Sequence, residues 1–238
     1  MRICVYTAVY GGYDNLKRWP QQTVDVDLIC FTDEARSDSN NGWRIVRASP
    51  AGHPRMRAKY FKILSHRVFP NGRLAWRYNR VQALLRGRTR YDVLIWVDGS
   101  VQVRSHRFVE EFVGQIGPSG WAMFRHPDRD CIYDELGASL PMEKYRDQPL
   151  DRQVASYRAE GYPAHCGLMA CGLIARHARD HRHRRINNAW WQENRRWSYQ
   201  DQLSLPVVLW RMGYACEMVA LNLWDNPWFD LVPHSSDA

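Results

Sequence analysis

Short apolar runs alternate along the chain with longer segments whose apolar residues recur at helical spacing. The apolar runs predict strands at residues 2–9, 26–31, 43–46, 93–97, 121–124 and 168–175. The helical spacing predicts helices at residues 56–68, 108–116, 151–160, 187–197 and 199–213. Strands that alternate with helices are typical of an α/β fold with a mostly parallel sheet. We therefore predict a single domain over residues 1–234, followed by a short tail at 235–238.

The end of the fourth predicted strand carries distinctive chemistry. The apolar run from Val93 to Val97 is followed directly by Asp98, Gly99 and Ser100. In open α/β folds, ligands bind at the carboxyl ends of the strands. Two oxygen-bearing side chains on either side of a glycine suit a divalent cation that carries a diphosphate. The alternative is an ordinary strand end with an Asp turn.

Two further strand ends carry polar groups that would meet Asp98 at the same edge. Thr7 lies near the end of the first strand, and Asp33 follows the second. We predict that both hydrogen-bond a base or a ribose, while Asp98 faces the phosphates. On the predicted helix 56–68 and just before it, four basic side chains form a candidate diphosphate clamp: Arg55, Arg57, Lys59 and Lys62. Solvent-exposed helix charges are the alternative.

The segment from Phe124 to Glu135 is dense in reactive side chains and has no regular periodicity, which indicates a loop. We predict that it presents His126 as a metal ligand or orienting group and Glu135 as a catalytic, acceptor-binding carboxylate. Alternatively, Arg129 holds the loop through an ion pair with an acid. Farther on, Asp201 and Gln202 begin a predicted helix, where an acid either stabilises the helix dipole or points into a cleft.

The net charge of +8 over 238 residues is concentrated in two segments. Residues 71–90 form a basic insert with six arginines and no acid, and residues 176–185 contain five arginines and one Asp. Local arginine clusters suggest a polyanionic partner, although a solvated face is the alternative for either segment. The six scattered cysteines and the absence of an 18-residue apolar stretch favour a cytoplasmic protein without a membrane span.

Several strings of residues, taken together, are more specific than any single motif. They are Val5-Tyr-Thr-Ala-Val-Tyr-Gly-Gly-Tyr-Asp14, Cys30-Phe-Thr-Asp33, Arg57-Ala-Lys-Tyr-Phe-Lys62, Ile95-Trp-Val-Asp98-Gly-Ser100, His126-Pro-Asp-Arg129-Asp-Cys-Ile-Tyr-Asp-Glu135, Trp190-Trp191 and Asp201-Gln202-Leu203. In this order, over roughly residues 3–213, the chain resembles a glycosyltransferase-like family of the TOD/MUCI type. The family is known from plant wall and mucilage proteins and from bacterial and phage proteins.

This resemblance implies a GT-A-like, Rossmann-like domain that binds a nucleotide sugar, with a UDP-sugar as the expected donor. It places Tyr6, Thr7, Ala8 and Asp33 at the nucleotide. It also implies Mg²⁺ or Mn²⁺ at a DxD-type motif formed by Asp98 and Ser100, in which Ser replaces the second acid. Asp201 and Gln202 resemble the Asp-Gln pair that faces the sugar in related enzymes. Gln200 stands where the resemblance leads us to expect an Arg that contacts a phosphate or the acceptor.

Three functions with different acceptors follow from these observations. The first is a glycosyltransferase that modifies a hydroxymethylated base, such as hydroxymethylcytosine in phage DNA, with arginines tracking phosphates and tryptophans stacking on bases. The acceptor contacts expected for it are Arg73, Arg77, Arg80, Arg129, Trp190 and Trp191. The second is a glycosyltransferase acting on a capsule or wall polysaccharide or another glycan. The third is a non-catalytic nucleic-acid-binding protein on a degenerate transferase fold.

Overall fold

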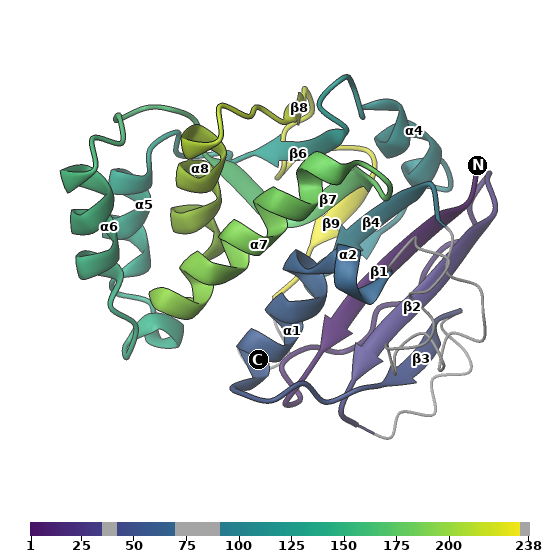
Figure 1. Cartoon of the computed structure of the whole chain (residues 1–238). Coiled ribbons are helices and arrows are strands. Elements are labelled where there is room, and N and C mark those ends of the chain that lie inside the picture. The colour runs from purple at the N-terminus through teal and green to yellow at the C-terminus, as the bar shows by residue number, and fades with distance from the viewer. Residues whose placement is uncertain (35–41, 70–90, 234–238) are drawn as a thin grey trace.

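A mostly parallel sheet organises the chain, as the alternation of strands and helices predicts. The computed structural model describes residues 1–34, 42–69 and 91–233. Within them, seven strands form one sheet in the order β3-β2-β1-β4-β7-β6-β8 (Figure 1). Strands β3, β2, β1 and β4 are parallel neighbours, whereas β7 is antiparallel to both β4 and β6. The strands of this sheet are β1 Ile3–Val9, β2 Val26–Thr32, β3 Arg44–Arg47, β4 Val93–Val97, β6 Trp121–Arg125, β7 Met169–His177 and β8 Glu217–Val219.

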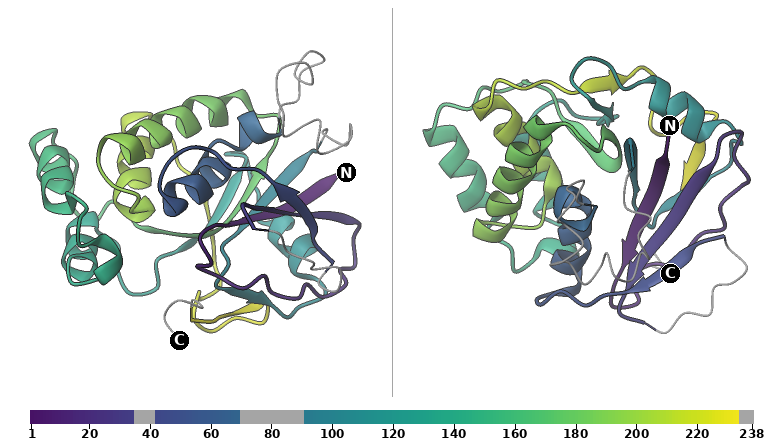
Figure 2. Two further views of the ribbon diagram at one scale, coloured as in Figure 1. Left: turned by 90° about the horizontal axis from the view of Figure 1, so that it is seen from below. Right: turned by 45° about the vertical axis from the view of Figure 1, so that its right-hand side comes forward.

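Helices cover one face of the sheet, and a helix with a small second sheet covers the other (Figures 1 and 2). The first face packs against α1 Pro54–Ile63, α2 Ser65–Val68, α7 His181–Arg196 and α8 Asp201–Arg211. The second face packs against α4 Phe108–Gly114 and a two-stranded sheet of β5 Val101–Val103 and β9 Phe229–Leu231. Beside α8, a third apolar cluster joins α5 Ile132–Ser139, the 3-10 turn Glu143–Tyr145 and α6 Leu150–Ala159.

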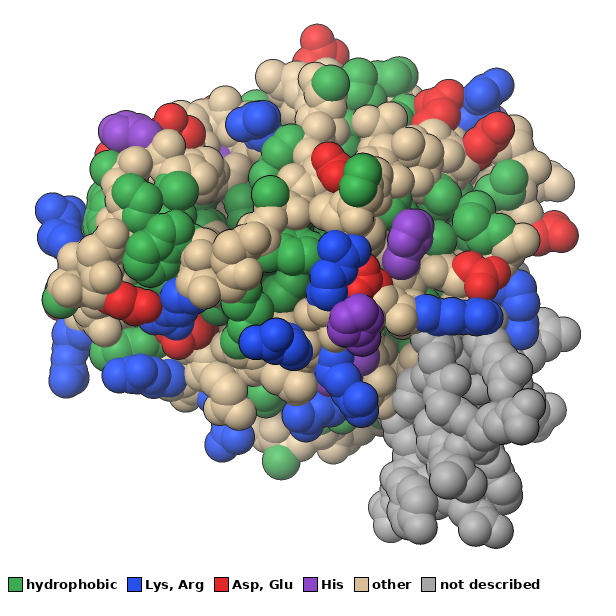
Figure 3. Space-filling model, turned by 45° about the horizontal axis from the view of Figure 1, so that its top comes forward, with side chains coloured by type: hydrophobic (Ala, Val, Ile, Leu, Met, Phe, Trp, Pro, Cys, Tyr) green, Lys and Arg blue, Asp and Glu red, His purple; other side chains and the backbone are tan. Residues whose placement is uncertain are grey.

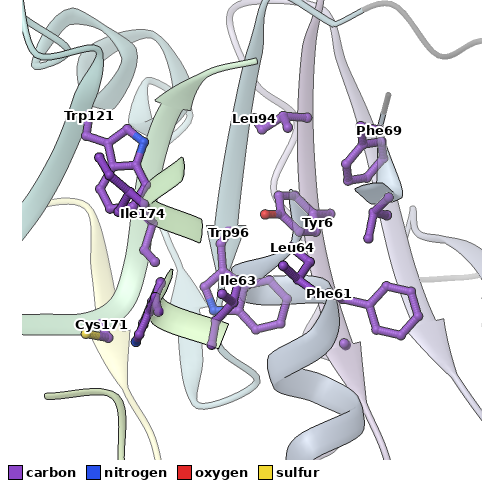
Figure 4. Packing of buried hydrophobic residues seen from close by; sticks show 14 of the residues in the cluster. Tyr6, Phe61, Ile63, Leu64, Phe69, Leu94, Trp96, Trp121, Cys171 and Ile174 are labelled. Atoms are coloured by element: carbon purple, nitrogen blue, oxygen red, sulfur yellow. The ribbon is translucent and has the colours of Figure 1, made fainter. Parts of the chain in front are cut away.

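Strand β1 shows why the central strands read as continuous apolar runs. Every residue from Ile3 to Val9 is buried, because successive side chains enter opposite layers. Tyr6 packs edge-on against Trp96 and Phe69 on the helix-covered face, as Figure 4 shows. Val5, on the alternate phase, belongs to the core shared with α4. A strand buried on both sides leaves only its ends for polar chemistry.

Three expectations about the secondary structure need correction. The helix predicted over 56–68 is interrupted at Leu64, which caps α1 and precedes α2. The segment 124–135 is not wholly a loop, because α5 begins at Ile132. Helix α7 begins at His181, six residues before the predicted start, because the carboxylate of Asp180 accepts a hydrogen bond from the amide of Arg182 and caps the helix.

The predicted meeting of three strand ends is confirmed by the topology. Strands β2, β1 and β4 are parallel neighbours in that order, so the residues that follow them gather at one edge. Thr32 pairs in register with Val9, which places Asp33 beside the end of β1. Among the described residues, no helix has the length and apolar character needed to cross a membrane.

Candidate active site

A cavity of about 680 Å³ opens at the carboxyl end of β4. Its walls come from the segment after β1, the first half of α1, the β4–β5 turn, the β6–α5 segment and the start of α8. The lining includes these charged and polar side chains: Asp14, Arg55, Lys59, Lys62, Asp98, Ser100, His126, Arg129, Glu135, Lys144, Gln200, Asp201 and Gln202. The fold therefore brings most of the predicted catalytic and metal residues into one cavity.

Lys62 joins the two aspartates that the sequence singles out. Its ammonium lies 3.3 Å from Asp98 Oδ1 and 2.7 Å from Asp201 Oδ2, and the side chain is only 2% exposed. Burial opposes the charge on Lys62, but the carboxylates of Asp201 and Asp98 outweigh it and raise the pKa of this group. Lys62 is therefore a buried cation that ties α1 to both β4 and α8.

Asp201 is a buried carboxylate in which one oxygen forms ion pairs and the other has no hydrogen-bond partner. Oδ2 receives the ammonium groups of both Lys59 and Lys62, and the side chain is 3% exposed. Burial opposes its charge, but the two lysines prevail and lower the pKa of Asp201, so the carboxylate is ionised at neutral pH. Oδ1 is buried and has no hydrogen-bond partner in the structure. Asp201 lines the cavity, so this unpaired acceptor is a candidate contact for a ligand donor.

Two further oxygen-bearing side chains line the cavity with Asp98. Trp96 Nε1 donates to Asp98 Oδ1 at 2.6 Å, while a third of the Asp98 side chain stays exposed. Asp14 supplies a carboxylate that lies over Gly99, so closely that a Cβ at this glycine would overlap it. Asp14 and Ser100 line the same cavity as Asp98. Two carboxylates and a hydroxyl fit Mg²⁺ or Mn²⁺ in chemical type.

Glu135 forms a second buried carboxylate network with different partners. Arg129 Nε donates to its Oε2 at 2.7 Å, and Ser139 Oγ and Gln200 Nε2 donate to its Oε1 at 3.1 and 2.9 Å. The Arg129–Glu135 ion pair, which the sequence left as an alternative, is therefore present. Gln200 is part of this network and ties the start of α8 to α5.

His126 belongs to the Glu135 network. Its Nδ1 accepts from the backbone amides of Asp128 and Arg129 at 3.2 Å, and its Nε2 lies 3.1 Å from Arg129 Nη2 and 3.7 Å from Glu135 Oε2. Burial lowers the pKa of His126 and favours the neutral ring. Both ring nitrogens are thus engaged beside Glu135. These contacts favour the orienting role over the metal-ligand role predicted for His126.

The residues expected at the nucleotide are divided between the cavity wall and the core. Ala8 lines the cavity. Thr7 is 2% exposed, and its hydroxyl lacks a partner. Asp33, which follows β2, forms an ion pair with Arg57 at 3.0 Å. These two residues, predicted to contact the donor, therefore bind each other in this structure. The side chain of Tyr6 is buried in the core, where its hydroxyl accepts from Arg176, so direct donor contact by this side chain is wrong.

The acceptor residues expected for nucleic acid are also scattered. Arg73, Arg77 and Arg80 lie outside the described residues. Trp190 is fully buried and donates its indole N–H to Ser204 at 3.1 Å, so its assignment as a base-stacking surface is wrong. Trp191, one position later, is half-buried and packs edge-on against Tyr60.

The second basic segment also needs correction, because one of its arginines is internal. Arg176 is 1% exposed, and its guanidinium donates to Tyr6 and to the backbone of Lys62. The exposed arginines of α7 include Arg182, Arg184 and Arg185. Figure 3 shows Lys and Arg side chains gathered over the lower half of one face, beside histidines.

Sequence reasoning missed Asp14, Ser139 and the structural part played by Gln200. Asp14 follows Gly11 and Gly12 closely in the sequence, and its approach to Gly99 depends on tertiary packing. The available signal was the glycine itself, because a residue without a Cβ directly after a candidate ligand indicates close approach by another group.

Comparison with known proteins agrees with this geometry. Residues 1–232 match the family model described as TOD1/MUCI70, glycosyltransferase-like domain. A protein of Arabidopsis thaliana named probable hexosyltransferase MUCI70 is 24% identical over 241 residues. The match covers 87% of this chain and 37% of that protein, so the chain spans little more than a third of the relative's length. The chain belongs to the TOD1/MUCI70 family of glycosyltransferase-like domains.

Proposed function

We propose that the protein transfers a hexosyl group from a nucleoside-diphosphate sugar, with a UDP-sugar as the first donor to test, to a hydroxyl of a carbohydrate acceptor. Family membership and the name of the plant relative, probable hexosyltransferase, support the reaction class. The cavity supports it by bringing together lysine ammonium groups, the oxygen ligands around Asp98 and the Asp201 carboxylate, whose Oδ1 has no partner.

The observation that carries the proposal is the unpartnered Oδ1 of Asp201. An ionised carboxylate at this point can accept a sugar hydroxyl or stabilise positive charge at the anomeric carbon. Lys59 and Lys62 hold the other oxygen, which fixes the orientation of the group before substrate binds. Preorganised charge of this kind costs no reorganisation during the reaction. Asp201 is therefore the residue we assign to the sugar ring.

The donor diphosphate is assigned to the Asp98 side of the cavity. Asp98, Ser100 and Asp14 would hold Mg²⁺ or Mn²⁺, which when bound neutralises charge on the leaving diphosphate. Lys59 keeps a fifth of its side chain exposed and lies next to this site. In the transfer, the acceptor oxygen bonds to the anomeric carbon as the bond from that carbon to the diphosphate breaks. The hydroxyl proton is released.

Glu135 is assigned a positioning role. Its carboxylate accepts from Arg129, Ser139 and Gln200, and every one of these bonds would weaken if Glu135 moved toward a substrate. The network presents the exposed part of Arg129 to the cavity and sets the start of α8, where Asp201 is located. This assignment replaces the catalytic role predicted for Glu135 with an indirect one.

A carbohydrate acceptor is favoured by a second hollow beside the first. This hollow, about 710 Å³, shares His53, Arg55, Lys144 and Tyr199 with the cavity. Trp191 and Trp197 also line it. Aromatic side chains can stack on sugar faces, so a hollow lined by Trp191, Trp197 and Tyr199 suits a carbohydrate. Trp190 and Arg176 are buried in the core and cannot contact a nucleic acid, which weakens the nucleic-acid alternative.

Donor hydrolysis and transfer would test this function directly. The protein is incubated with pooled nucleotide sugars and Mn²⁺, and released nucleoside diphosphate is measured with wall-type oligosaccharides, with hydroxymethylcytosine-containing DNA, or without acceptor. Mass gain on an oligosaccharide supports the proposal, whereas mass gain on DNA nucleosides moves the acceptor to nucleic acid. Asp201→Asn should abolish release, while Asp151→Asn, an exposed acid in the first turn of α6, should not. Equal activity in both variants, or none in the wild type, would contradict the assignment.

A further inference from the structure

Outside the cavity, three potential metal ligands converge between two loops. Cys131, Asp134 and His165 each place one ligand atom within 4.8 Å of the other two. Cys131 caps the start of α5, and Asp134 lies in the first turn of that helix. His165 comes from the segment between α6 and β7, more than thirty residues away along the chain. The thiol is buried, and the other two groups are exposed.

A fourth side chain orients the histidine. Asp130 Oδ1 lies 2.7 Å from Nδ1 of His165, which leaves Nε2 as the ring nitrogen that can face a metal. A carboxylate that holds the second nitrogen of a metal-binding histidine is the usual outer partner at zinc sites. The backbone of Asp130 also accepts from the amide of Gly167 at 2.9 Å, so the two loops are already joined at this point.

The backbone of His165 is held in an uncommon conformation. Its φ of +53° is the single positive value among the described residues other than glycine. Such a conformation costs about 1 kcal/mol or more for a residue with a Cβ and persists where the surroundings fix it. Here it turns the imidazole toward Asp130 and the start of α5.

We propose that Cys131, Asp134 and His165 bind Zn²⁺, with water at the fourth position. One sulfur, one imidazole nitrogen and one carboxylate oxygen match the ligand preference of zinc, whereas Mg²⁺ and Mn²⁺ prefer all-oxygen sites such as the one around Asp98. Zinc bonds of about 2.0–2.3 Å hold tetrahedral ligands roughly 3–4 Å apart, so small side-chain rotations close the site. The inference does not depend on the proposed function.

Zinc at this point would fix one wall of the cavity. Residues 126–131 connect the site to Asp128 and Arg129, which line the cavity. The amide of His126 donates to the carbonyl of Leu168, on the second loop. A metal bridging the two loops would add a third and stronger link to these two backbone bonds. Its effect is structural support of the β6–α5 segment.

Metal binding to the untagged, full-length protein tests the site. After removal of metal by chelation, Zn²⁺ alone is titrated and its stoichiometry and affinity are measured, and Co²⁺ is used as a spectroscopic substitute. We expect one Zn²⁺ per chain and a thiolate-to-cobalt charge-transfer absorption. His165→Gln and Asp134→Asn change exposed side chains, and each should weaken zinc binding by more than tenfold. Asp130→Asn should weaken it by about tenfold.

Two matched controls identify the ligands. His181→Gln removes an exposed histidine elsewhere, and Cys166→Ser removes the exposed thiol adjacent to His165; both should bind zinc as the wild type does. Cys131→Ser should remove the charge-transfer absorption while circular dichroism shows a folded protein. Wild-type affinity in His165→Gln would overturn the proposal. So would a cobalt spectrum that survives in Cys131→Ser but is lost in Cys166→Ser.

Discussion

The cavity is lined by two buried carboxylates, Glu135 and Asp201, that differ in the partners of their oxygen atoms. Glu135, 2% exposed, accepts from three side chains and has a donor on each oxygen. Asp201, 3% exposed, receives two ammonium groups on one oxygen and nothing on the other. Three donors leave Glu135 little remaining capacity for a substrate, whereas Asp201 keeps one oxygen without any partner. Burial is therefore common to both acids and does not identify the one that contacts substrate. Glu135 and Asp201 differ in whether an oxygen is left without a hydrogen-bond partner.

Substitution of Lys62 should have the largest effect on stability, because its ammonium group pairs with both Asp98 and Asp201. Lys62→Met leaves Asp98 without this partner and gives Asp201 one lysine in place of two. Breaking a buried ion pair costs about 3–5 kcal/mol, so urea unfolding should show a loss of that order. Lys17→Met, at a half-buried site before β2, is the control and should change stability little. An equal, small loss in both would mean that Lys62 does not anchor the site.

Acid should have the next largest effect, because it weakens the ion pairs of Asp201 with Lys59 and Lys62. The pKa of Asp201 is lowered below its ordinary value of 3.8, so the unfolded chain takes up a proton before the folded protein does. The stabilisation is therefore complete above about pH 4 and is lost as the pH falls through the folded-state pKa. Thermal unfolding between pH 6 and 3 should show a steeper loss for the wild type than for Asp201→Asn. Parallel curves would contradict the lowered pKa.

Glu135→Gln should affect stability more than turnover. One of the donors Arg129, Ser139 and Gln200 would then face an amide N–H, and a buried unsatisfied group costs about 1–3 kcal/mol. We expect the melting temperature to fall and kcat to change less than about tenfold, against a loss of at least a hundredfold in Asp201→Asn. A larger kcat loss in Glu135→Gln than in Asp201→Asn would reverse the roles assigned to the two acids.

The fold was more predictable from sequence than the site. Apolar runs identified the central strands, with β4 predicted at its observed limits, because a strand buried on both faces needs apolar residues throughout. Helix α5 was missed because its first turn carries Asp134 and Glu135 and hides the apolar face. The short strands β5, β8 and β9 have three residues each, too few for periodicity to register.

The site depended on tertiary contacts that spacing does not encode. The sequence singled out Asp98 and Asp201, which line one cavity in the structure, but it did not indicate the Lys62 bridge between them or the approach of Asp14 to Gly99. Trp190 and Trp191 show the limit clearly, since adjacent residues of one type have different environments. Helical phase decides which of them faces the core, and the arginine-rich pattern of α7 leaves this phase ambiguous.

The smallest effects should come from that tryptophan pair, and they test whether the second hollow holds the acceptor. Trp190→Phe removes a buried hydrogen bond and some core volume, so it should cost about 1–2 kcal/mol in stability and leave the acceptor KM unchanged. Trp191→Ala should also lower stability, because Trp191 packs against Tyr60 and the core, but only this variant should raise the acceptor KM, about threefold to tenfold, because it removes a stacking surface. The donor KM should stay constant in both variants. If Trp191→Ala left the acceptor KM unaltered, sugar binding would have to be assigned to another part of the cavity rim.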